Sequence, residues 1–213
     1  MAAAGVHILS HPLVNAKLAV LRDANTSAKD FREGIRDLTY LVTIEASRDL
    51  EERPVAGHTP VSEFTGSTIA PRIGITPILR AGLGMTDAML SLFPNAPVYH
   101  IGLFREKVSL QPVEYYSKLP KTPTVDKVFI VDPLIATGGT AIAAVQMILD
   151  WGIPIKDIKF LGILASQAGL DHVKSEFPEL EIWFAAVDAE LTPQGYIKPG
   201  LGDTGDRLYS TLH

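Results

Sequence analysis

The sequence predicts an α/β fold, a single domain built on a central parallel sheet with helices on both faces. Short apolar runs that suit buried strands alternate with stretches that suit helices. This alternation is typical of parallel strands joined by crossovers. The length of 213 residues is enough for one full-sized domain and does not require a second. Because we find no internal repeat and no low-complexity linker, residues 1–213 are expected to form one domain with a protruding arm.

The predicted elements follow one another along the chain. Residues 25–53 carry apolar side chains spaced for one buried helical face. The stretch "ERPVAGHTPVSEFTG", with two prolines and two glycines, predicts a turn-rich excursion or a hairpin arm. The strands of the sheet are "RIGITPIL", "PVYHIGLF", "KVFIVDPL", "IKFLGILAS" and a last strand, "EIWFAAVD". The crossover helices are "GLGMTDAMLSLFP", "GTAIAAVQMILDWG" and "AGLDHVKSEFP".

Composition and charge exclude several classes of protein. With 46% hydrophobic and 20% charged residues the chain is too apolar for disorder. A net charge of -5 argues against nucleic acid as a partner, although it allows a local basic pocket. The absence of cysteine excludes disulfides, thiolate metal sites and a cysteine nucleophile. The sequence shows neither a signal peptide nor an apolar run near the roughly 20 residues of a membrane span, so we expect a cytoplasmic protein without a membrane partner.

The loop in "VDPLIATGGT" joins the strand Val128–Val131 to a helix expected from Thr140 to Leu149. In open parallel sheets, ligands bind beyond the carboxyl ends of the strands. Gly138 and Gly139 leave the backbone open to a ligand, and free amides at a helix N-terminus attract an anion. Asp132 is placed to accept hydrogen bonds from two sugar hydroxyls or to hold a metal through water. The loop therefore predicts a cradle for a phosphate and a ribose.

A helix-capping turn is the alternative interpretation of this loop. Thr140 would be the N-cap and the glycines would allow a tight turn. That interpretation leaves Asp132 and the double glycine without a role. No lysine follows the glycines, so the loop is not a Walker loop, and it is not the dinucleotide GxGxxG motif either.

The stretch "PILRAGLGM" places Arg80 at a strand end, directly before a glycine-rich turn. A guanidinium beside exposed amides suits a diphosphate, because it offers a planar fork of donors. A surface arginine that caps a helix or pairs with an acid is the alternative.

The stretch "GLFREKVSLQPVEYYSKLP" predicts a mobile flap in which Arg105 and Lys107 contact an anionic substrate. A hairpin arm used in dimer contact is the alternative, especially for Tyr115 and Tyr116.

The C-terminal stretch "GYIKPGLGDTGDRLYST" contains four glycines, which build a tight, irregular backbone. Such a backbone presents N–H and C=O groups that can read a flat heterocycle by hydrogen bonds. The alternative is a simple salt-bridged turn formed by Asp203, Asp206 and Arg207.

Together these stretches make the sequence similar to the uracil phosphoribosyltransferases, from about Ile75 to Thr211. "VDPLIATGGT" resembles the family's signature for 5-phosphoribosyl 1-diphosphate (PRPP), which phosphoribosyltransferases share in general form. "PILRAGLGM" and "HIGLFRE…LQPVEYYSKLP" resemble two further blocks. The tail, in which "GYI" and "GDTGDR" occur together, is more specific to the uracil enzymes.

The resemblance implies a type I phosphoribosyltransferase fold whose C-terminal part, about residues 188–213, forms a uracil-binding hood over the active site. It implies a glycosyltransferase of pyrimidine salvage that transfers the phosphoribosyl group of PRPP to N1 of uracil, giving UMP and diphosphate. One Mg²⁺ per subunit, bound with the diphosphate, is implied as cofactor. A homodimer or higher homo-oligomer is implied as the assembly, and GTP is a candidate effector.

The resemblance also assigns roles to single residues. Asp132, Arg105 and Asp203 are the expected catalytic residues, and Asp203 is also placed to meet the metal or the diphosphate. The expected uracil-binding residues are Ile197, Gly202, Asp203 and Thr204. The expected PRPP-binding residues are Arg80, Arg105, Asp132, Pro133, Leu134, Ile135, Ala136, Thr137, Gly138, Gly139, Thr140 and Asp203.

The sequence departs from common family patterns at two places. Pro133 stands where many phosphoribosyltransferases have a second acid, as in the uracil branch, so Asp132 alone serves the ribose. Gln167 and Ala168 stand where the family usually has a proline and an acid, in a loop expected near the ribose phosphate. Two other functions stay open: a non-catalytic regulator that binds nucleotide or RNA, which a pI near 5.7 disfavours, and the same chemistry on another base.

Overall fold

The computed structural model describes residues 5–105 and 112–211, and its centre is an eight-stranded sheet. The strand order is β1-β10-β9-β7-β4-β5-β6, with β8 paired to β9. All pairings are parallel except that of β5 with β6 at one edge, so the predicted central parallel sheet is confirmed. The strands are β1 (Val6–Ile8), β4 (Ile73–Leu79), β5 (Ile101–Arg105), β6 (Pro112–Ser117), β7 (Lys127–Val131), β8 (Leu134–Ile135), β9 (Ile158–Ser166) and β10 (Glu181–Asp188).

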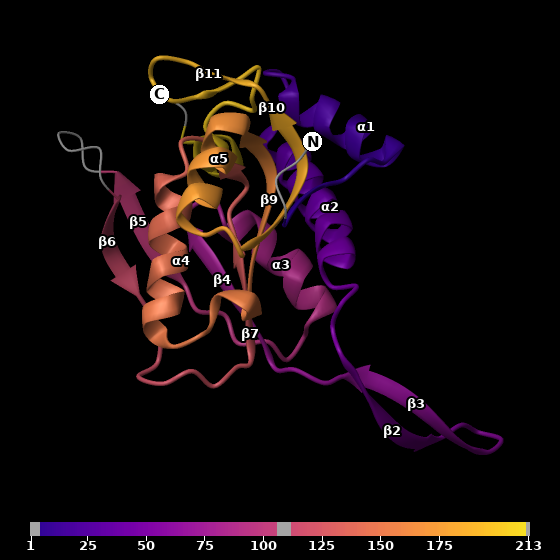
Figure 1. The fold of residues 1–213 in the computed structure, drawn as a ribbon. Coiled ribbons are helices and arrows are strands. Elements are labelled where there is room, and N and C mark those ends of the chain that lie inside the picture. Colours follow the sequence, from indigo (N-terminus) through magenta and orange to yellow (C-terminus); the bar gives the residue numbers. More distant parts are fainter. Residues whose placement is uncertain (1–4, 106–111, 212–213) are drawn as a thin grey trace.

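Helices cover both faces of the sheet (Figure 1). One face carries α1 (Pro12–Arg22), α2 (Ala28–Ala46) and α3 (Leu83–Leu92). The other face carries α4 (Gly139–Trp151) and α5 (Gln167–Glu176). A short 3₁₀ helix, Ile155–Asp157, leads into β9. None of the helices in the described part of the chain is both long and apolar enough to cross a membrane.

The central strand β7 shows why its sequence is a continuous apolar run. Phe129 and Val131 pack into the layer of α1, α2 and α3, whereas Val128 and Ile130 pack into the layer of α4 and α5. All four side chains are fully buried. Because successive side chains of a strand point to opposite faces, a strand covered on both sides favours apolar residues at every position.

The first long helix is shorter than the sequence predicts. It was expected over residues 25–53, but α2 spans Ala28–Ala46 and the chain enters strand β2 at Glu52. At its start, the Ser27 side chain accepts a hydrogen bond from the backbone N–H of Asp30, which is a standard N-cap. The stretch before it forms the separate helix α1, which was not expected, nor were β1 and β8.

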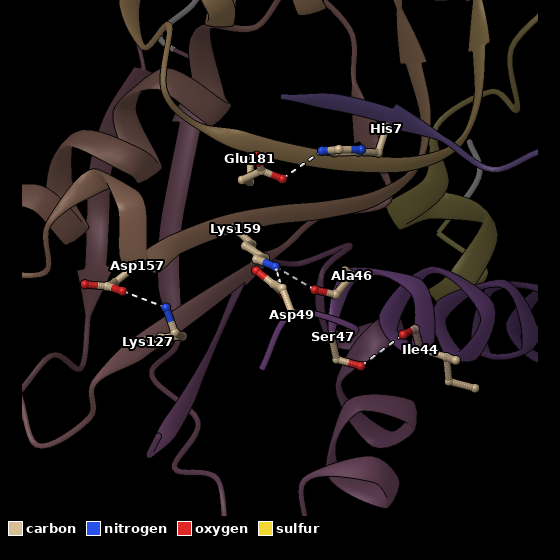
Figure 2. Close-up of polar contacts among 9 residues, drawn as sticks. All are labelled: His7, Ile44, Ala46, Ser47, Asp49, Lys127, Asp157, Lys159 and Glu181. Carbon is tan, nitrogen blue, oxygen red and sulfur yellow. Dashed lines mark hydrogen bonds and ion pairs between the residues drawn. The ribbon is translucent and has the colours of Figure 1, made fainter. Parts of the chain in front are cut away.

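The C-terminal end of α2 is held by a buried lysine from the sheet. Lys159 of β9 is 4% exposed, and its Nζ donates to the Ala46 carbonyl (2.7 Å) and to Asp49 Oδ1 (2.5 Å) (Figure 2). A cation beside the last carbonyls of a helix complements its macrodipole. This contact stabilises the end of the helix, and it cannot be predicted from the helix sequence because Lys159 lies 113 residues away from Ala46.

The predicted hairpin arm is confirmed. Strands β2 (Glu52–His58) and β3 (Glu63–Ile69) form a separate two-stranded antiparallel sheet. Figure 1 shows that this arm projects away from the body of the domain.

The predicted flap is also a hairpin over its described residues. Pro112–Ser117 forms strand β6, antiparallel to β5, instead of a long loop. Tyr115 and Tyr116 are about half exposed on this strand. A Cβ at Gly102 would lie 2.6 Å from the ring of Tyr115, so this glycine allows the tyrosine to cross β5. Lys107 lies outside the described residues, as does the side chain of Arg105, which ends β5.

Candidate active site

The loops after β4 and β7 lie against each other at the carboxyl edge of the sheet. β4 and β7 are adjacent parallel strands, so Leu79 and Val131 end at the same side. A Cβ at Gly82 would lie 2.5 Å from the Val131 carbonyl and 2.6 Å from the Ile78 amide nitrogen. Only glycine fits there, and the Arg80 turn is therefore packed directly on the end of β7.

The loop after β7 wraps around a small cavity. It passes through Asp132 and β8, and Gly138 has a positive φ of 88°. The first helical hydrogen bond of α4 runs from the Ile142 N–H to the Gly138 carbonyl, so the amides before Ile142 precede the helical ladder. The cavity has a volume of about 100 Å³, and it is lined by Asp132, Leu134, Ile135, Ala136, Thr137, Gly138, Thr140 and Ala141.

The capping-turn interpretation of this loop is wrong in its assignment of Thr140. Helix α4 begins at Gly139, and its N-cap is Gly138, which has no side chain to cap the amides. The helix, expected to end at Leu149, continues to Trp151, and Gly152 closes it as a left-handed C-cap with φ 112°. A bare N-terminus with a strongly curved glycine before it is suited to an external anion.

Helix α5 supports the loop from behind. The Ser166 hydroxyl caps α5 by accepting from the Gly169 N–H (2.8 Å) and donates to the Ala136 carbonyl. Nδ1 of His172 lies 2.8 Å from the Thr137 carbonyl. A Cβ at Gly169 would overlap the Ala136 carbonyl. The start of α5 is thus in contact with the backbone of the loop.

Gln167 and Ala168 begin this helix, at the departure from the family pattern. Gln167 Nε2 donates to Asp171 Oδ1 at 2.8 Å, one helical turn onward. Gln167 and Ala168 therefore lie beside the loop after β7, as the resemblance implies. The Ser166 cap and the contact of Gly169 with that loop are both present next to them.

Asp132 is a partly buried carboxyl group with an unusual pKa. Burial raises the pKa of Asp132 to about 7, the charge of Asp203 adds to the rise, and a hydrogen bond from the Leu134 backbone N–H opposes it. The influence of Asp203 means that the loop after β7 and the C-terminal hood bring their carboxylates toward one another. Perturbed carboxyl groups of this kind cluster at functional sites.

Arg80 binds the hood in this structure. Its Nη2 donates to Asp206 Oδ1 (2.9 Å) and its Nη1 donates to Thr211 Oγ1 (3.2 Å). The structure therefore shows the alternative interpretation of Arg80, in which it pairs with an acid, here Asp206. The alternative of a local salt-bridged turn in the tail is wrong, because Arg207 donates to the carbonyls of Leu21, Leu201 and Asp23 instead.

The hood consists of the hairpin of β11 (Glu190–Leu191) and β12 (Ile197–Lys198), an irregular turn, and the helix α6 (Thr204–Tyr209). Ile197 and Thr204 are buried, whereas Gly202 and Asp203 are exposed. Gly200 and Gly202 have φ values of 68° and 74°, where L side chains are strained. The Asp203 carboxylate caps α6 by accepting from the Asp206 N–H (2.9 Å).

Two arginines fasten the hood to the domain: Arg22, which sequence reasoning missed, and Arg207, which it named only in the alternative of a salt-bridged turn. Arg22 of α1 donates through Nη1 and Nη2 to both oxygens of Asp188, at 2.7 and 2.6 Å. Asp188 also accepts from the Gly200 N–H at 2.9 Å. Burial acts to raise the pKa of Asp188, but the hydrogen bonds from Arg22 and Gly200 hold it below its usual value. Arg207 stacks over Phe31 of α2, with its guanidinium carbon 4.1 Å from the ring centroid.

Comparisons with known proteins agree on one family. A family model of uracil phosphoribosyltransferases matches residues 8–211. The uracil phosphoribosyltransferase of Roseiflexus sp. (strain RS-1) is 47% identical over 208 residues, 98% of this chain and 99% of the relative. The structure of the AQ2163 protein from Aquifex aeolicus matches with a TM-score of 0.87 and 35% identity, over 96% of this chain and 98% of that one.

The chain belongs to the uracil phosphoribosyltransferase family. The predicted resemblance is confirmed, and so is the type I phosphoribosyltransferase fold. An orotate phosphoribosyltransferase from Mycobacterium tuberculosis shares that fold at 13% identity and a TM-score of 0.50, over 85% of this chain and 95% of that one. As a member of the family, the chain is a glycosyltransferase of pyrimidine salvage, and the comparisons do not support the non-catalytic regulator.

The two glycines at the start of α4, Gly138 as N-cap and Gly139 as first helical residue, make a matched pair for testing the loop. Gly138→Ala forces a side chain into a left-handed conformation and places its Cβ 2.8 Å from the Gly169 carbonyl, so unfolding free energy should fall by about 1–3 kcal/mol. Gly139→Ala meets no protein atom within 4 Å and should be neutral or slightly stabilising. Urea denaturation measures both. Equal stabilities of the two variants would contradict the account of this loop.

The raised pKa of Asp132 predicts a pH-dependent affinity for UMP. The resemblance implies that ribose hydroxyls donate to the ionised Asp132 carboxylate, in which case binding needs Asp132 to lose its proton. With a pKa of about 7, affinity should be about half-maximal at pH 7 and about tenfold weaker at pH 6 than at pH 8. Protonation of the UMP phosphate also weakens binding at pH 6, so Asp132→Asn serves as the control. Calorimetry should show a smaller ratio of the two dissociation constants in that variant, and equal ratios would contradict the assignment.

Proposed function

We propose that the chain transfers the 5-phosphoribosyl group of PRPP to N1 of uracil, giving UMP and diphosphate. The observation that carries the proposal is the meeting of three segments at one edge of the sheet: the loop with Asp132, the turn with Arg80, and the hood with Asp203. Relatives that carry the name uracil phosphoribosyltransferase over nearly their whole length support the same reaction.

The 5-phosphate binds to the loop Thr137–Thr140, where backbone amides and two threonine hydroxyls converge. The bare N-terminus of α4 and the cavity beside it support this role. Asp132, at the same cavity, accepts hydrogen bonds from the ribose hydroxyls. Residues Pro133–Ala136 complete the contact with PRPP as the backbone between these two groups.

The diphosphate binds to Arg80 and the amides of its turn, and Arg105 approaches from the β5–β6 hairpin. Uracil is read by backbone groups of Ile197, Gly202 and Thr204, together with Asp203. The positive φ of Gly202 and the exposure of Gly202 and Asp203 support a backbone surface that a flat base can approach.

The reaction requires charge stabilisation and positioning. As the bond between C1 of the ribose and the diphosphate breaks, its electron pair leaves with the diphosphate and C1 becomes positive. N1 of uracil bonds to C1, and its proton passes to solvent or to the departing diphosphate. Asp132 places negative charge beside the ribose, and Arg80 places positive charge at the leaving group. No covalent nucleophile is needed.

One Mg²⁺ per subunit would be held together with the diphosphate of PRPP. The nearby carboxylates of Asp132 and Asp203 are hard oxygen donors that fit this ion. Within residues 5–105 and 112–211 no group of three or more His, Cys, Asp or Glu side chains forms a metal site. Diphosphate oxygens and water would therefore supply most ligands, with Asp203 as the candidate protein contact. When bound, the ion would neutralise charge on the leaving group.

The chain further acts as a homo-oligomer. The arm supports this, because a two-stranded hairpin is marginal alone and its side chains Val55, Val61 and Phe64 are exposed, Val61 to 93%. Light scattering tests the assembly, and a monomer at micromolar concentration would contradict it. The cytoplasmic location and GTP as an effector stay predictions.

The reaction is tested by formation of UMP from uracil and PRPP with Mg²⁺. Wild type should form UMP, and Asp132→Asn and Asp203→Ala should each lower kcat/KM by about 10–100-fold, because each removes a charge at the substrate. Asp150→Asn is the matched control, since Asp150 lies at the far end of α4 and bonds only to Gln146 in the described contacts. Its activity should stay within twofold. Absence of UMP with wild type, or full activity of Asp132→Asn, would contradict the proposal.

A further inference from the structure

Arg80 and Asp206, 126 residues apart, form part of a closed triangle of hydrogen bonds. Arg80 donates to Asp206 Oδ1 (2.9 Å) and to Thr211 Oγ1 (3.2 Å), and the Thr211 hydroxyl donates to Asp206 Oδ1 (2.6 Å). One corner of the triangle belongs to the turn after β4, and two belong to the hood.

The triangle holds the guanidinium without covering it. A guanidinium has five N–H donors in a fixed fork, and these two contacts use one donor on each terminal nitrogen. The Arg80 side chain is still 52% exposed. Asp206 and Thr211 therefore fix one edge of the fork and leave the rest to solvent or to an anion.

The hood side of the triangle is itself rigidly placed. The Asp206 N–H donates to the Asp203 carboxylate (2.9 Å), so the two aspartates belong to one helical turn. Leu208 of α6 packs on Gly84, where a Cβ would lie 2.9 Å from Leu208 Cδ1. The Tyr209 hydroxyl also reaches the Arg80 carbonyl (3.4 Å). The position of Arg80 thus depends on the docking of the hood.

We propose that Asp206 is a positioning residue. It holds the Arg80 guanidinium in the orientation that binds the diphosphate, and this orientation depends on the docked position of the hood. The inference rests on the proposed role of Arg80 as a diphosphate contact. An arginine side chain loses considerable rotamer freedom when it binds, and an arginine that is already held loses less. The attraction between Asp206 and Arg80 also competes with the diphosphate, but at this exposure it is weakened by solvent.

The test is calorimetric binding of inorganic diphosphate with Mg²⁺, compared with ribose 5-phosphate. Asp206→Asn should weaken diphosphate binding about fivefold to tenfold and change ribose 5-phosphate binding by less than twofold. In steady-state assays KM for PRPP should rise more than kcat falls. Glu190→Gln is the matched control, because it removes the exposed Lys198–Glu190 ion pair of the same hood (3.0 Å) without touching Arg80; both affinities should be unchanged.

Two further variants separate positioning from a loss of structure. Thr211→Val removes one side of the triangle and keeps the charge of Asp206, so it should weaken diphosphate binding in the same direction and by less. In an Arg80→Gln background, Asp206→Asn should have no further effect on diphosphate affinity, because it acts through Arg80.

The outcomes distinguish this inference from the proposed function. A wild-type enzyme that makes UMP, but whose diphosphate affinity is unchanged or increased by Asp206→Asn, would overturn the positioning role and leave the reaction intact. Additive losses in the double variant would overturn it as well. A wild-type protein that forms no UMP would overturn the proposed function itself.

Discussion

The close contact between the ends of β4 and β7 is the constraint on which the site depends. Both strands are buried on both faces, so their direction and register are fixed by the core. Gly82 then lies against the Val131 carbonyl with no space for a side chain. The turn that carries Arg80 and the loop that carries Asp132 are therefore placed relative to each other by packed backbone. Neither relies on a flexible side chain for its position.

The hood is the part of the site that the sheet does not place, and arginines fasten it to the domain beside the buried side chains of Ile197, Leu201 and Leu208. Asp188 and Arg22 form a largely buried bidentate pair that also binds the Gly200 amide, and Arg207 satisfies three backbone carbonyls. Bidentate pairs of this kind fix geometry as well as adding energy. The result is a hood held in register with the helices α1 and α2, which positions Asp203 toward Asp132.

Sequence reasoning could predict the parts of the molecule that local pattern determines. Apolar periodicity and the placement of glycines predict the five strands β4, β5, β7, β9 and β10, the arm, and the loop with Gly138. The C-terminal end of α2 could not be predicted in this way, because Lys159 acts from another part of the chain. The pairing of Asp206 with Arg80 could not be predicted either, because the two residues lie 126 positions apart. The sequence offers the adjacent Arg207 as the local partner of Asp206. The strand β6 was expected only in the alternative of a hairpin arm, because its polar and aromatic residues also suit a loop.

We propose that one edge of the sheet binds phosphate, ribose and base at the same time, and a crystal structure with bound UMP would show whether it does. We expect the phosphate at the amides of residues 137–140, the ribose hydroxyls on the Asp132 carboxylate, and uracil against the backbone of residues 197–204. UMP bound elsewhere, or with its base away from the hood, would contradict it.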